Sequence, residues 1–424
     1  MSVADPFAPE TAASPRWLSI VGIGEDGVAG LSERARELVR AAEIVFGGKR
    51  HLALAASLIG GAARPWPSPF DRATDQVLAQ RGRRVCVLAS GDPFFHGVGA
   101  LLARHIDARE MQVVPQPSAF SLAAARLGWA LPDTTLLSLH ARALDLVRPH
   151  LHPGARVLAL TSDGKGPPAL ALLLAQSGFG PSRLTVLEAL GGPRERVHTA
   201  TAAQFDLGAA DDLNIVAIEV AVEPGARIVA RSAGLRDALF EHDGQITKRE
   251  IRAITLSALA PRRGELLWDI GAGAGSVAIE WMLADPSLRA IAIERRADRA
   301  ARIRRNAAAL GVPGLEIVEG IAPAVLQDLP RPAAVFIGGG ASGARVIETA
   351  MAALESGGRL VVNAVSLATE QMLIARYANL GGELTRKTSS AKSASDKSAS
   401  ARSASDKSAW RPALPVTQWA WVKP

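Results

Sequence analysis

A glycine-rich turn between an apolar run and a helical run constrains the fold of the second half of this chain. Residues 266–270 (LLWDI) predict a buried strand, and residues 276–283 predict the helix that follows. Gly271, Gly273 and Gly275 lie between them, where glycine lets the backbone approach a ligand and the first helical amides can face it. The sequence therefore predicts an α/β unit with a small-molecule site at this turn.

The glycine spacing indicates which ligand the turn holds. A dinucleotide fingerprint needs a third glycine where this chain has Ser276, so the pattern is GxGxG. Residues 290–293 predict the next strand, and Glu294 ends it. A carboxylate there can accept both ribose hydroxyls, which favours an adenosine ligand without a 2′-phosphate. The alternative is a tight strand-to-helix turn that binds nothing.

A second glycine pattern follows a strand-like run at residues 17–21. Its glycines are Gly22, Gly24 and Gly27. Glu25 and Asp26 lie inside this loop, where two carboxylates would repel a pyrophosphate. Glu43 begins the next apolar run and does not end it, so it is misplaced for a ribose acid. We expect no dinucleotide site here.

The length of 424 residues predicts more than one domain. Pro224 and Gly225 interrupt the chain after a strand-like run at residues 213–220. Further strands are predicted at residues 84–89, 156–160 and 184–188, and helices at residues 235–241 and from residue 247. We predict a disordered tail over 1–15, an α/β domain over 16–222, a linker over 223–234 and a second α/β domain over 235–424.

One low-complexity segment interrupts the second domain. The sequence SASDKSA at residues 393–399 recurs at residues 403–409. Such a segment has almost nothing to bury, so we predict a disordered insertion over residues 388–409. The flanking residues 382–385 and 415–421 are strand-like, which predicts that the insertion lies inside a terminal hairpin.

Composition narrows the class of protein. The chain has no apolar run of about 18 residues and no signal-like N-terminus, so we expect a cytoplasmic protein without a membrane span. Cys86 is the only cysteine, which excludes an internal disulfide and a cysteine-cluster metal site. A net charge of +7 calls for anionic partners. Aromatic residues make up only 4%, which leaves few stacking platforms for nucleic acid.

Three segments of the first half resemble the tetrapyrrole methylases of cobalamin synthesis, which have the class III methyltransferase fold. They are residues 90–97 (SGDPFFHG), 117–123 (PSAFSLA) and 187–195 (LEALGGPRE). In the second half, residues 240–250 (FEHDGQITKRE) and 267–281 resemble the decarboxylating methyltransferases of the same pathway. The resemblance implies an αβα tetrapyrrole methylase domain followed by a class I, Rossmann-like methyltransferase domain. The N-terminal tail and the repeat insertion depart from it.

The resemblance also implies a reaction. The chain is expected to use S-adenosylmethionine at two sites, to methylate a precorrin at C5 and C15, and to remove carbon dioxide from the ring C acetate. The sulfonium cofactor is already activated, so the protein need mainly align the reactants and exclude water, without a metal. The expected partner is an anionic tetrapyrrole and not nucleic acid, and a homo-oligomer is expected. The carboxylates of the substrate would account for the positive net charge.

The resemblance implies a cofactor site in the second domain formed by Thr247, Gly271, Ala272, Gly273, Ala274, Gly275, Glu294, Gly320 and Ala322. Thr247 is alternatively an N-cap, with Glu250 completing a capping box. Arg249 and Arg252, three residues apart on one predicted helix, are candidate partners for substrate carboxylates. A solvated helix face is the alternative for these arginines.

In the first domain, the resemblance implies a cofactor site formed by Gly91, Asp92, Pro93, Ser118 and Ala119. Gly22 and Gly24 would line the substrate trough. Asp92 is alternatively a turn residue before Pro93. No catalytic residue is identified, and the weak candidates are His96, which is alternatively structural, and Asn363, which follows a predicted strand at residues 360–362.

Two other classes of protein remain open. One is a tetrapyrrole-binding protein with a single active methyltransferase domain. The other is a nucleic-acid methyltransferase, although amino-methylating enzymes carry an acid-Pro-Pro-aromatic motif where this chain has residues 336–340 (FIGGG).

Overall fold

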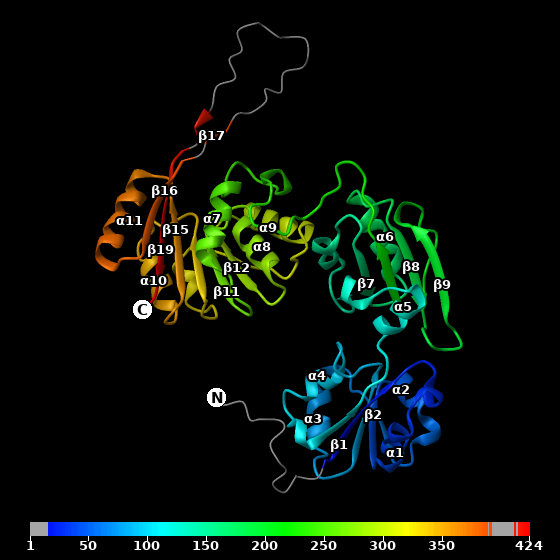
Figure 1. The fold of residues 1–424 in the computed structure, drawn as a ribbon. Helices are drawn as coiled ribbons and strands as arrows, with labels where there is room; N and C mark the ends of the chain where they lie inside the picture. Colours follow the sequence, from blue (N-terminus) through cyan, green and yellow to red (C-terminus); the bar gives the residue numbers. More distant parts are fainter. Residues whose placement is uncertain (1–15, 389, 392–410, 413) are drawn as a thin grey trace, which may run out of the picture. The chain divides into compact units, whose positions relative to one another are not determined.

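The computed structural model describes residues 16–388, 390–391, 411–412 and 414–424, which form two compact units (Figure 1). Unit 1 comprises the described residues up to Arg142 together with Pro153–Ala226. Unit 2 comprises Ala143–His152 and the described residues from Arg227 onward. The predicted tail over residues 1–15, and residues 389 and 392–409 of the predicted insertion, lie outside the described residues.

The boundary between the units, at Ala226 and Arg227, falls inside the predicted linker over residues 223–234. Val229 is only 2% exposed and packs with Leu235 in the core of unit 2. The 3-10 helix η6 (Leu144–His150), from the first half of the chain, also belongs to unit 2. Within unit 2, η6 packs closely against Gly311, where a Cβ would lie 2.3 Å from Cδ of Pro149. The Pro-Gly break thus lies close to the boundary, and Val229 in the partly exposed segment after it packs into unit 2.

Unit 1 contains two five-stranded sheets. The first is parallel, in the order β3-β2-β4-β1-β5. Its strands are β1 (Leu18–Ile23), β2 (Ile44–Gly47), β3 (Ala62–Pro65), β4 (Val85–Ser90) and β5 (Met111–Val114). Its helices are α1 (Glu33–Ala41), α2 (Lys49–Leu54), α3 (Ala73–Leu78) and α4 (Val98–Leu102), and α5 (Ala119–Leu127) follows β5.

The second sheet of unit 1 is mixed, in the order β6-β7-β10-β8-β9. Its strands are β6 (Thr134–Ser138), β7 (Arg156–Leu160), β8 (Arg183–Glu188), β9 (Arg196–Thr201) and β10 (Asn214–Glu219), with α6 (Gly166–Gln176) between β7 and β8. Only the β6–β7 pair is parallel. The predicted strands at 17–21, 84–89, 156–160, 184–188 and 213–220 are confirmed as β1, β4, β7, β8 and β10.

Unit 2 contains a seven-stranded sheet in the order β13-β12-β11-β14-β15-β19-β16. Its strands are β11 (Leu266–Ile270), β12 (Arg289–Glu294), β13 (Glu316–Glu319), β14 (Ala334–Ile337), β15 (Arg359–Ala364), β16 (Glu383–Lys387) and β19 (Val416–Val422). Its helices are α7 (Arg249–Leu259), α8 (Ser276–Ala284), α9 (Ala297–Ala309), α10 (Val346–Ala353) and α11 (Leu367–Leu380). Helices α7, α8 and α9 pack into one core cluster, and α10 and α11 into another.

The predicted terminal hairpin is confirmed. Strand β16 pairs antiparallel with β19, from Glu383 opposite Ala420 to Lys387 opposite Val416. Two further short strands, β17 (Ser390–Ala391) and β18 (Arg411–Pro412), pair where the predicted insertion begins and ends. Within the described ranges, no helix combines the length and apolar character needed to cross a membrane.

The predicted helix over residues 235–241 is wrong. Only the 3-10 helix η8 (Asp237–Leu239) forms there. The buried carboxylate of Glu280 accepts hydrogen bonds from the amides of Gly234 and Leu235, at 2.6 and 2.9 Å. These bonds to a side chain satisfy donors without a helix and hold the segment in an extended path.

Candidate functional sites

The glycine turn of unit 2 connects β11 to α8 and brings its backbone close to neighbouring loops. Gly271 and Gly273 have φ values of +72° and +60°, a region that favours glycine. A Cβ on Gly271 would lie 2.5 Å from the carbonyl oxygen of Gly339, and one on Gly273 would lie 3.1 Å from that of Gln245. Gly271, Ala272 and Gly273 line a cavity of about 810 Å³.

Ala274 and Gly275, in the second part of the turn, are predicted to bind the cofactor but lie outside the described cavity lining. Ala274 is 1% exposed, and its carbonyl oxygen accepts a hydrogen bond from Nδ2 of Asn306 at 2.9 Å. Gly275 is the N-cap of α8, and a Cβ there would lie 2.7 Å from Cγ2 of Ile303. Both residues pack the turn against α9 and are absent from the described cavity wall, so the need for glycine at position 275 comes from packing.

Glu294 ends β12 and lines the same cavity. Its carboxylate is 4% exposed and accepts hydrogen bonds from the amides of Gly273 and Arg296, at 2.9 and 3.1 Å. Two backbone donors thus fix its orientation, while a carboxylate keeps further lone pairs for ligand hydroxyls. Gly320 and Ala322, after β13, line the cavity as well.

Thr247 lines this cavity, and the alternative role in helix capping is wrong. The N-cap of α7 is Lys248, which makes no side-chain capping bond. Lys248 itself lines the cavity, whereas its neighbour Arg249 is exposed and lies outside the described lining.

Arg252 is a structural residue, which corrects its prediction as a substrate ligand. Its side chain is fully buried. The guanidinium pairs with Glu280 at 2.5 Å and Asp237 at 3.2 Å, and it lies 4.8 Å from the ring centroid of Phe240. Arg249 and Arg252 therefore do not lie on one face of α7 as predicted. Arg249 points to solvent, and Arg252 points to the core.

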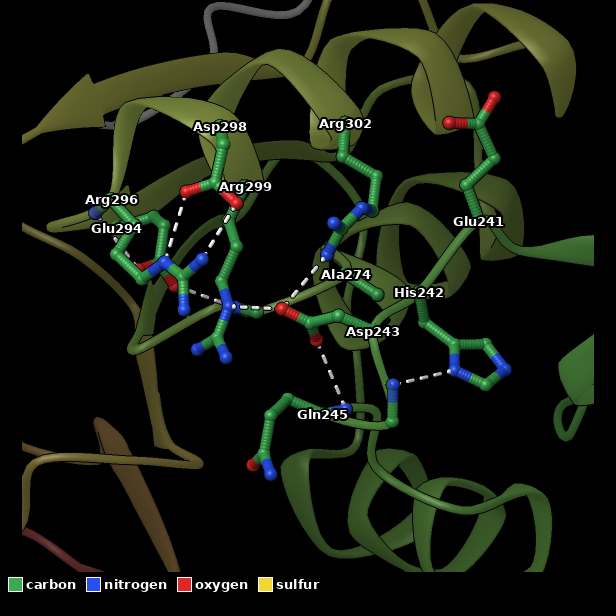
Figure 2. Close-up of polar contacts among 12 residues, drawn as sticks. Glu241, His242, Asp243, Gln245, Ala274, Glu294, Arg296, Asp298, Arg299 and Arg302 are labelled. Atoms are coloured by element: carbon green, nitrogen blue, oxygen red, sulfur yellow. Dashed lines mark hydrogen bonds and ion pairs between the residues drawn. The ribbon is translucent and has the colours of Figure 1, made fainter.

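The loop before α7 is fastened to α9 by ion pairs (Figure 2). Oδ2 of Asp243 accepts a hydrogen bond from Nε of Arg299 at 2.9 Å. The same oxygen lies 3.2 Å from Nη1 of Arg302. The hydrogen bond from Arg299 lowers the pKa of Asp243 well below its usual range. Oδ1 of the same carboxylate accepts from the amide of Gln245 at 3.2 Å. Because the carbonyl of Gln245 lies over Gly273, these contacts hold one wall of the cavity in place.

Asp269 lies beneath the turn, on β11. Its side chain is 1% exposed; Oδ2 accepts a hydrogen bond from the amide of Ala278 at 3.1 Å, and Oδ1 has no partner among the described residues. Burial, with a smaller contribution from Glu294, raises the pKa of Asp269 to about 7.

Asn363 lies in β15 and lines the same cavity as the glycine turn. The structure therefore brings this catalytic candidate together with Thr247, Glu294, Gly320 and Ala322.

Unit 1 has its own cavity, of about 420 Å³, lined by residues of both its sheets. Gly91, Ser118 and Ala119, which the resemblance implies for a cofactor site, lie in its wall. Gly91 has a φ of +53°, and a Cβ there would lie 2.8 Å from the carbonyl oxygen of Pro117. Ser118 caps α5 by accepting a hydrogen bond from the amide of Ser121 at 3.2 Å.

Asp92 and Pro93 shape this loop without lining the described cavity. Oδ1 of Asp92 accepts a hydrogen bond from the amide of Phe94 at 2.8 Å, and the carbonyl of Pro93 accepts one from the amide of Gly99 at 2.9 Å. The turn role that was open for Asp92 is the one that the structure shows.

Gly24 and His96 line the cavity of unit 1, whereas Gly22 does not. A Cβ on Gly22 would lie 1.9 Å from the carbonyl oxygen of Gly91, so Gly22 lets β1 and the Gly91 loop pack together. The imidazole of His96 is exposed, and its centroid lies 5.0 Å from that of Phe95.

Sequence reasoning missed a polar cluster in the cavity of unit 1, formed by Glu25, Arg50, His51 and Ser90. Oγ of Ser90 lies 2.9 Å from Nη2 of Arg50 and 2.8 Å from Nε2 of His51, and Arg50 pairs with Glu25. Burial, and then the charge of Arg50, lower the pKa of His51 to about 4. Arg50 and His51 lie in the first turn of α2, shortly after the carboxyl end of strand β2, a position that could have indicated ligand contact.

The described residues contain no group of three or more His, Cys, Asp or Glu side chains placed to hold a metal ion.

Comparison with known proteins defines the class first. Residues 18–206 match the family model of tetrapyrrole (corrin/porphyrin) methylases, and residues 238–423 match that of the precorrin methyltransferase domain. With an adenosine-type turn and acid on the unit 2 sheet, these matches define a two-domain methyltransferase.

Full-length relatives then give the family. A precorrin-6Y C(5,15)-methyltransferase [decarboxylating] of Sinorhizobium sp is 60% identical over 421 residues, covering 99% of this chain and 100% of the relative. The protein of the same name from Mycobacterium tuberculosis (strain H37Rv) is 40% identical, covering 95% and 99%. The C-terminal domain of such an enzyme from Rhodobacter capsulatus is 42% identical, covers 46% of this chain and 100% of that domain, and has a TM-score of 0.41. The chain belongs to the precorrin-6Y C(5,15)-methyltransferase (decarboxylating) family.

Membership of a methyltransferase family implies S-adenosylmethionine as the cofactor. The residues of unit 2 fit it. Gly271 and Gly273 let the backbone of the turn line the cavity closely, and the oriented carboxylate of Glu294 offers acceptors for ribose hydroxyls.

Proposed function

We propose that the chain transfers methyl groups to C5 and C15 of a precorrin and removes carbon dioxide from its ring C acetate. One observation carries the proposal: the cavity of unit 2 combines the glycine turn and Glu294 with a cationic rim of the exposed residues Lys248 and Arg295. The turn and the acid suit the cofactor, and the rim suits a substrate with many carboxylates.

We assign C5 methylation to unit 1 and C15 methylation with decarboxylation to unit 2. Each unit has its own cavity beside glycine loops, which supports two cofactor sites per chain. The unit 2 residues proposed to hold the cofactor are Thr247, Gly271, Ala272, Gly273, Glu294, Gly320 and Ala322. Those of unit 1 are Gly91, Ser118 and Ala119. Gly24, His96, Lys248 and Asn363 are proposed to contact the substrate.

When bound, S-adenosylmethionine supplies a methyl group that is already activated on its sulfonium. The residues of the two cavities then need only to bind and orient the reactants and to exclude water. This role explains why glycine loops and apolar walls dominate the cavities. Each methyl transfer replaces a hydrogen on the accepting carbon, so one proton leaves for each methyl group added. Loss of carbon dioxide leaves the electron pair of the broken C–C bond on the macrocycle side, and the former acetate carbon takes up a proton and becomes a methyl group.

The residues at the end of β14 argue against a substrate amine of a nucleobase. Gly338, Gly339 and Gly340 line the unit 2 cavity where an amino-methylating enzyme would present an acid and an aromatic ring. Glycines there leave space for a larger substrate.

The purified chain, supplied with reduced precorrin and S-adenosylmethionine, tests the proposal by product mass. We expect a product with two added methylene units and one carbon dioxide fewer. Gly273→Val should yield a product methylated once with its carboxyl group retained, because a β-branched side chain at this turn obstructs only the unit 2 site. A variant that lost both methylations together would contradict the division between units.

A further inference from the structure

A chain of hydrogen-bonded polar side chains runs to Asn363, with Thr255 and Gln418 buried and Asn363 and Lys387 half-buried. Nζ of Lys387 donates to Oε1 of Gln418 at 3.0 Å, and Nε2 of Gln418 donates to Oδ1 of Asn363 at 2.9 Å. Both Nε2 of Gln418 and Nδ2 of Asn363 also donate to Oγ1 of Thr255, each at 3.0 Å. The four residues come from β16, β19, β15 and α7, so the network crosses the sheet edge and reaches a helix that covers it.

The orientation of both amides in this network follows from the lysine. An ammonium group can only donate, so the carbonyl oxygen of Gln418 must face Lys387. The amino group of Gln418 then faces Oδ1 of Asn363, and the amino group of Asn363 faces Thr255. Thr255 is fully buried and Gln418 is 3% exposed, so a reversed amide would leave buried groups unpaired, at a cost of about 1–3 kcal/mol each.

The network also polarises Asn363 in one direction. Each carbonyl accepts a hydrogen bond from the cationic side, and each amino group donates away from it, which strengthens the next donor. Nδ2 carries two hydrogens, and Thr255 takes one. Asn363 lines the cavity, so the remaining hydrogen is a strengthened donor for a ligand there. Such a donor suits an anionic acceptor.

The place of Asn363 in the sheet separates it from the adenosine end of the site. Strand β15 is three strand positions from β12, which ends in Glu294, and this corresponds to roughly 14 Å. The nearby cavity residues Val365 and Leu414 are 67% and 76% exposed. Apolar side chains at a cavity mouth suit the flat face of a macrocycle and not the cofactor.

We propose that Asn363 binds a carboxylate of the tetrapyrrole substrate, and that Lys387, Gln418 and Thr255 are positioning residues that fix its amide for this contact. The inference rests on the proposed function of unit 2, because it names the substrate contact of that same site.

The test uses the full-length chain and compares three readouts: S-adenosylmethionine affinity, C15 methylation with carbon dioxide release, and C5 methylation. Gln418→Glu keeps the partner of Lys387 but cannot donate to Asn363. We expect kcat/KM for the unit 2 reactions to fall by about tenfold or more, with cofactor affinity and C5 methylation unchanged. Thr255→Ser, which keeps the acceptor oxygen, should stay near wild type, whereas Thr255→Val should resemble Gln418→Glu.

The sign of the charge at Asn363 gives a second test. Asn363→Asp fits the same space but presents an anion, so KM for the precorrin should rise more than in Asn363→Ala. The matched control is Thr417→Val, because Thr417 is the neighbouring buried residue of β19 and bonds instead to Glu370 at 2.7 Å. This control should leave KM for the precorrin unchanged.

Two results would overturn the inference. One is wild-type precorrin kinetics in Gln418→Glu; the other is an Asn363→Asp enzyme that binds the precorrin as well as Asn363→Ala does. If Gln418→Glu does not fold, the comparison of Thr255→Ser with Thr255→Val tests the inference instead. A wild-type chain that neither methylates C15 nor releases carbon dioxide would instead contradict the proposed function itself.

Discussion

The carboxylate of Glu294 accepts a hydrogen bond from the amide of Gly273 at 2.9 Å, so the acid at the end of β12 fixes the glycine turn that follows β11. Glu294→Ala removes both this bond and the proposed ribose acceptor. We expect cofactor affinity at unit 2 to weaken by roughly 1–3 kcal/mol, measured by calorimetry. Glu294→Gln, which keeps one acceptor oxygen, should lose less. Equal affinity in the alanine variant and wild type would contradict the assigned site.

Gly22 and Gly24 offer a matched pair of substitutions in unit 1. A Cβ on Gly22 meets the backbone oxygen of Gly91 at 1.9 Å, whereas one on Gly24 meets the movable carboxylate of Asp26 at 2.7 Å. Gly22→Ala should therefore destabilise unit 1 by about 1–3 kcal/mol and lower C5 methylation, as overpacking does. Gly24→Ala should be tolerated better. Melting curves and product masses compare them, and a reversed order would show that the loop packing is misassigned.

Asp269 predicts a pH dependence of the stability of unit 2. Its pKa is about 7 in the folded chain and about 4 in an unfolded one. Between these values the folded state holds a proton that the unfolded state has lost. The free energy of unfolding should therefore fall as pH rises through this window, by at most about 4 kcal/mol.

Asp269→Asn keeps an acceptor for the amide of Ala278 and cannot ionise. The variant should lack this loss of stability and should be more stable than wild type above pH 7. Urea unfolding at several pH values, followed by the fluorescence of buried Trp268 and Trp281, measures the difference. Identical pH profiles for both proteins would show that Asp269 does not titrate as described.

The unit boundary predicts where the chain can be divided. Fragments ending at Ala226 and starting at Arg227 should each bind S-adenosylmethionine, because each cavity is lined by one unit alone. The second fragment should melt at a lower temperature than unit 2 in the intact chain, because it lacks η6 and its contact with Gly311. Calorimetry on each fragment checks both expectations, and loss of binding in both would indicate a composite site.

Much of the fold could be predicted because local patterns and burial agree. The apolar runs at β1, β4, β7, β8, β11 and β12 are buried strands, and the glycine turn joins β11 to α8 as expected. The prediction failed where a distant side chain decides local structure. Glu280 holds the amides of Gly234 and Leu235 from 45 residues or more along the chain, and no pattern within residues 235–241 reveals that contact.

The candidate site shows the same limit. The glycines and Glu294 belong to one strand-turn-helix-strand pattern, so their spacing predicts their proximity. The sequence around Arg252 is compatible with a ligand role. Its burial comes from contacts with Glu280 and Phe240, which the local sequence does not reveal. The cluster of Arg50, His51 and Ser90 forms only when β2 and β4 pair, so sequence spacing does not indicate it.

The stoichiometry of labelled S-adenosylmethionine bound to the purified chain at equilibrium tests the two-site account most directly. Equilibrium dialysis should give two cofactors bound per chain, falling to one in Gly273→Val, because that substitution obstructs the unit 2 turn alone. A single cofactor per chain in the wild-type protein, or two in Gly273→Val, would contradict the assignment of one methyl-transfer site to each unit.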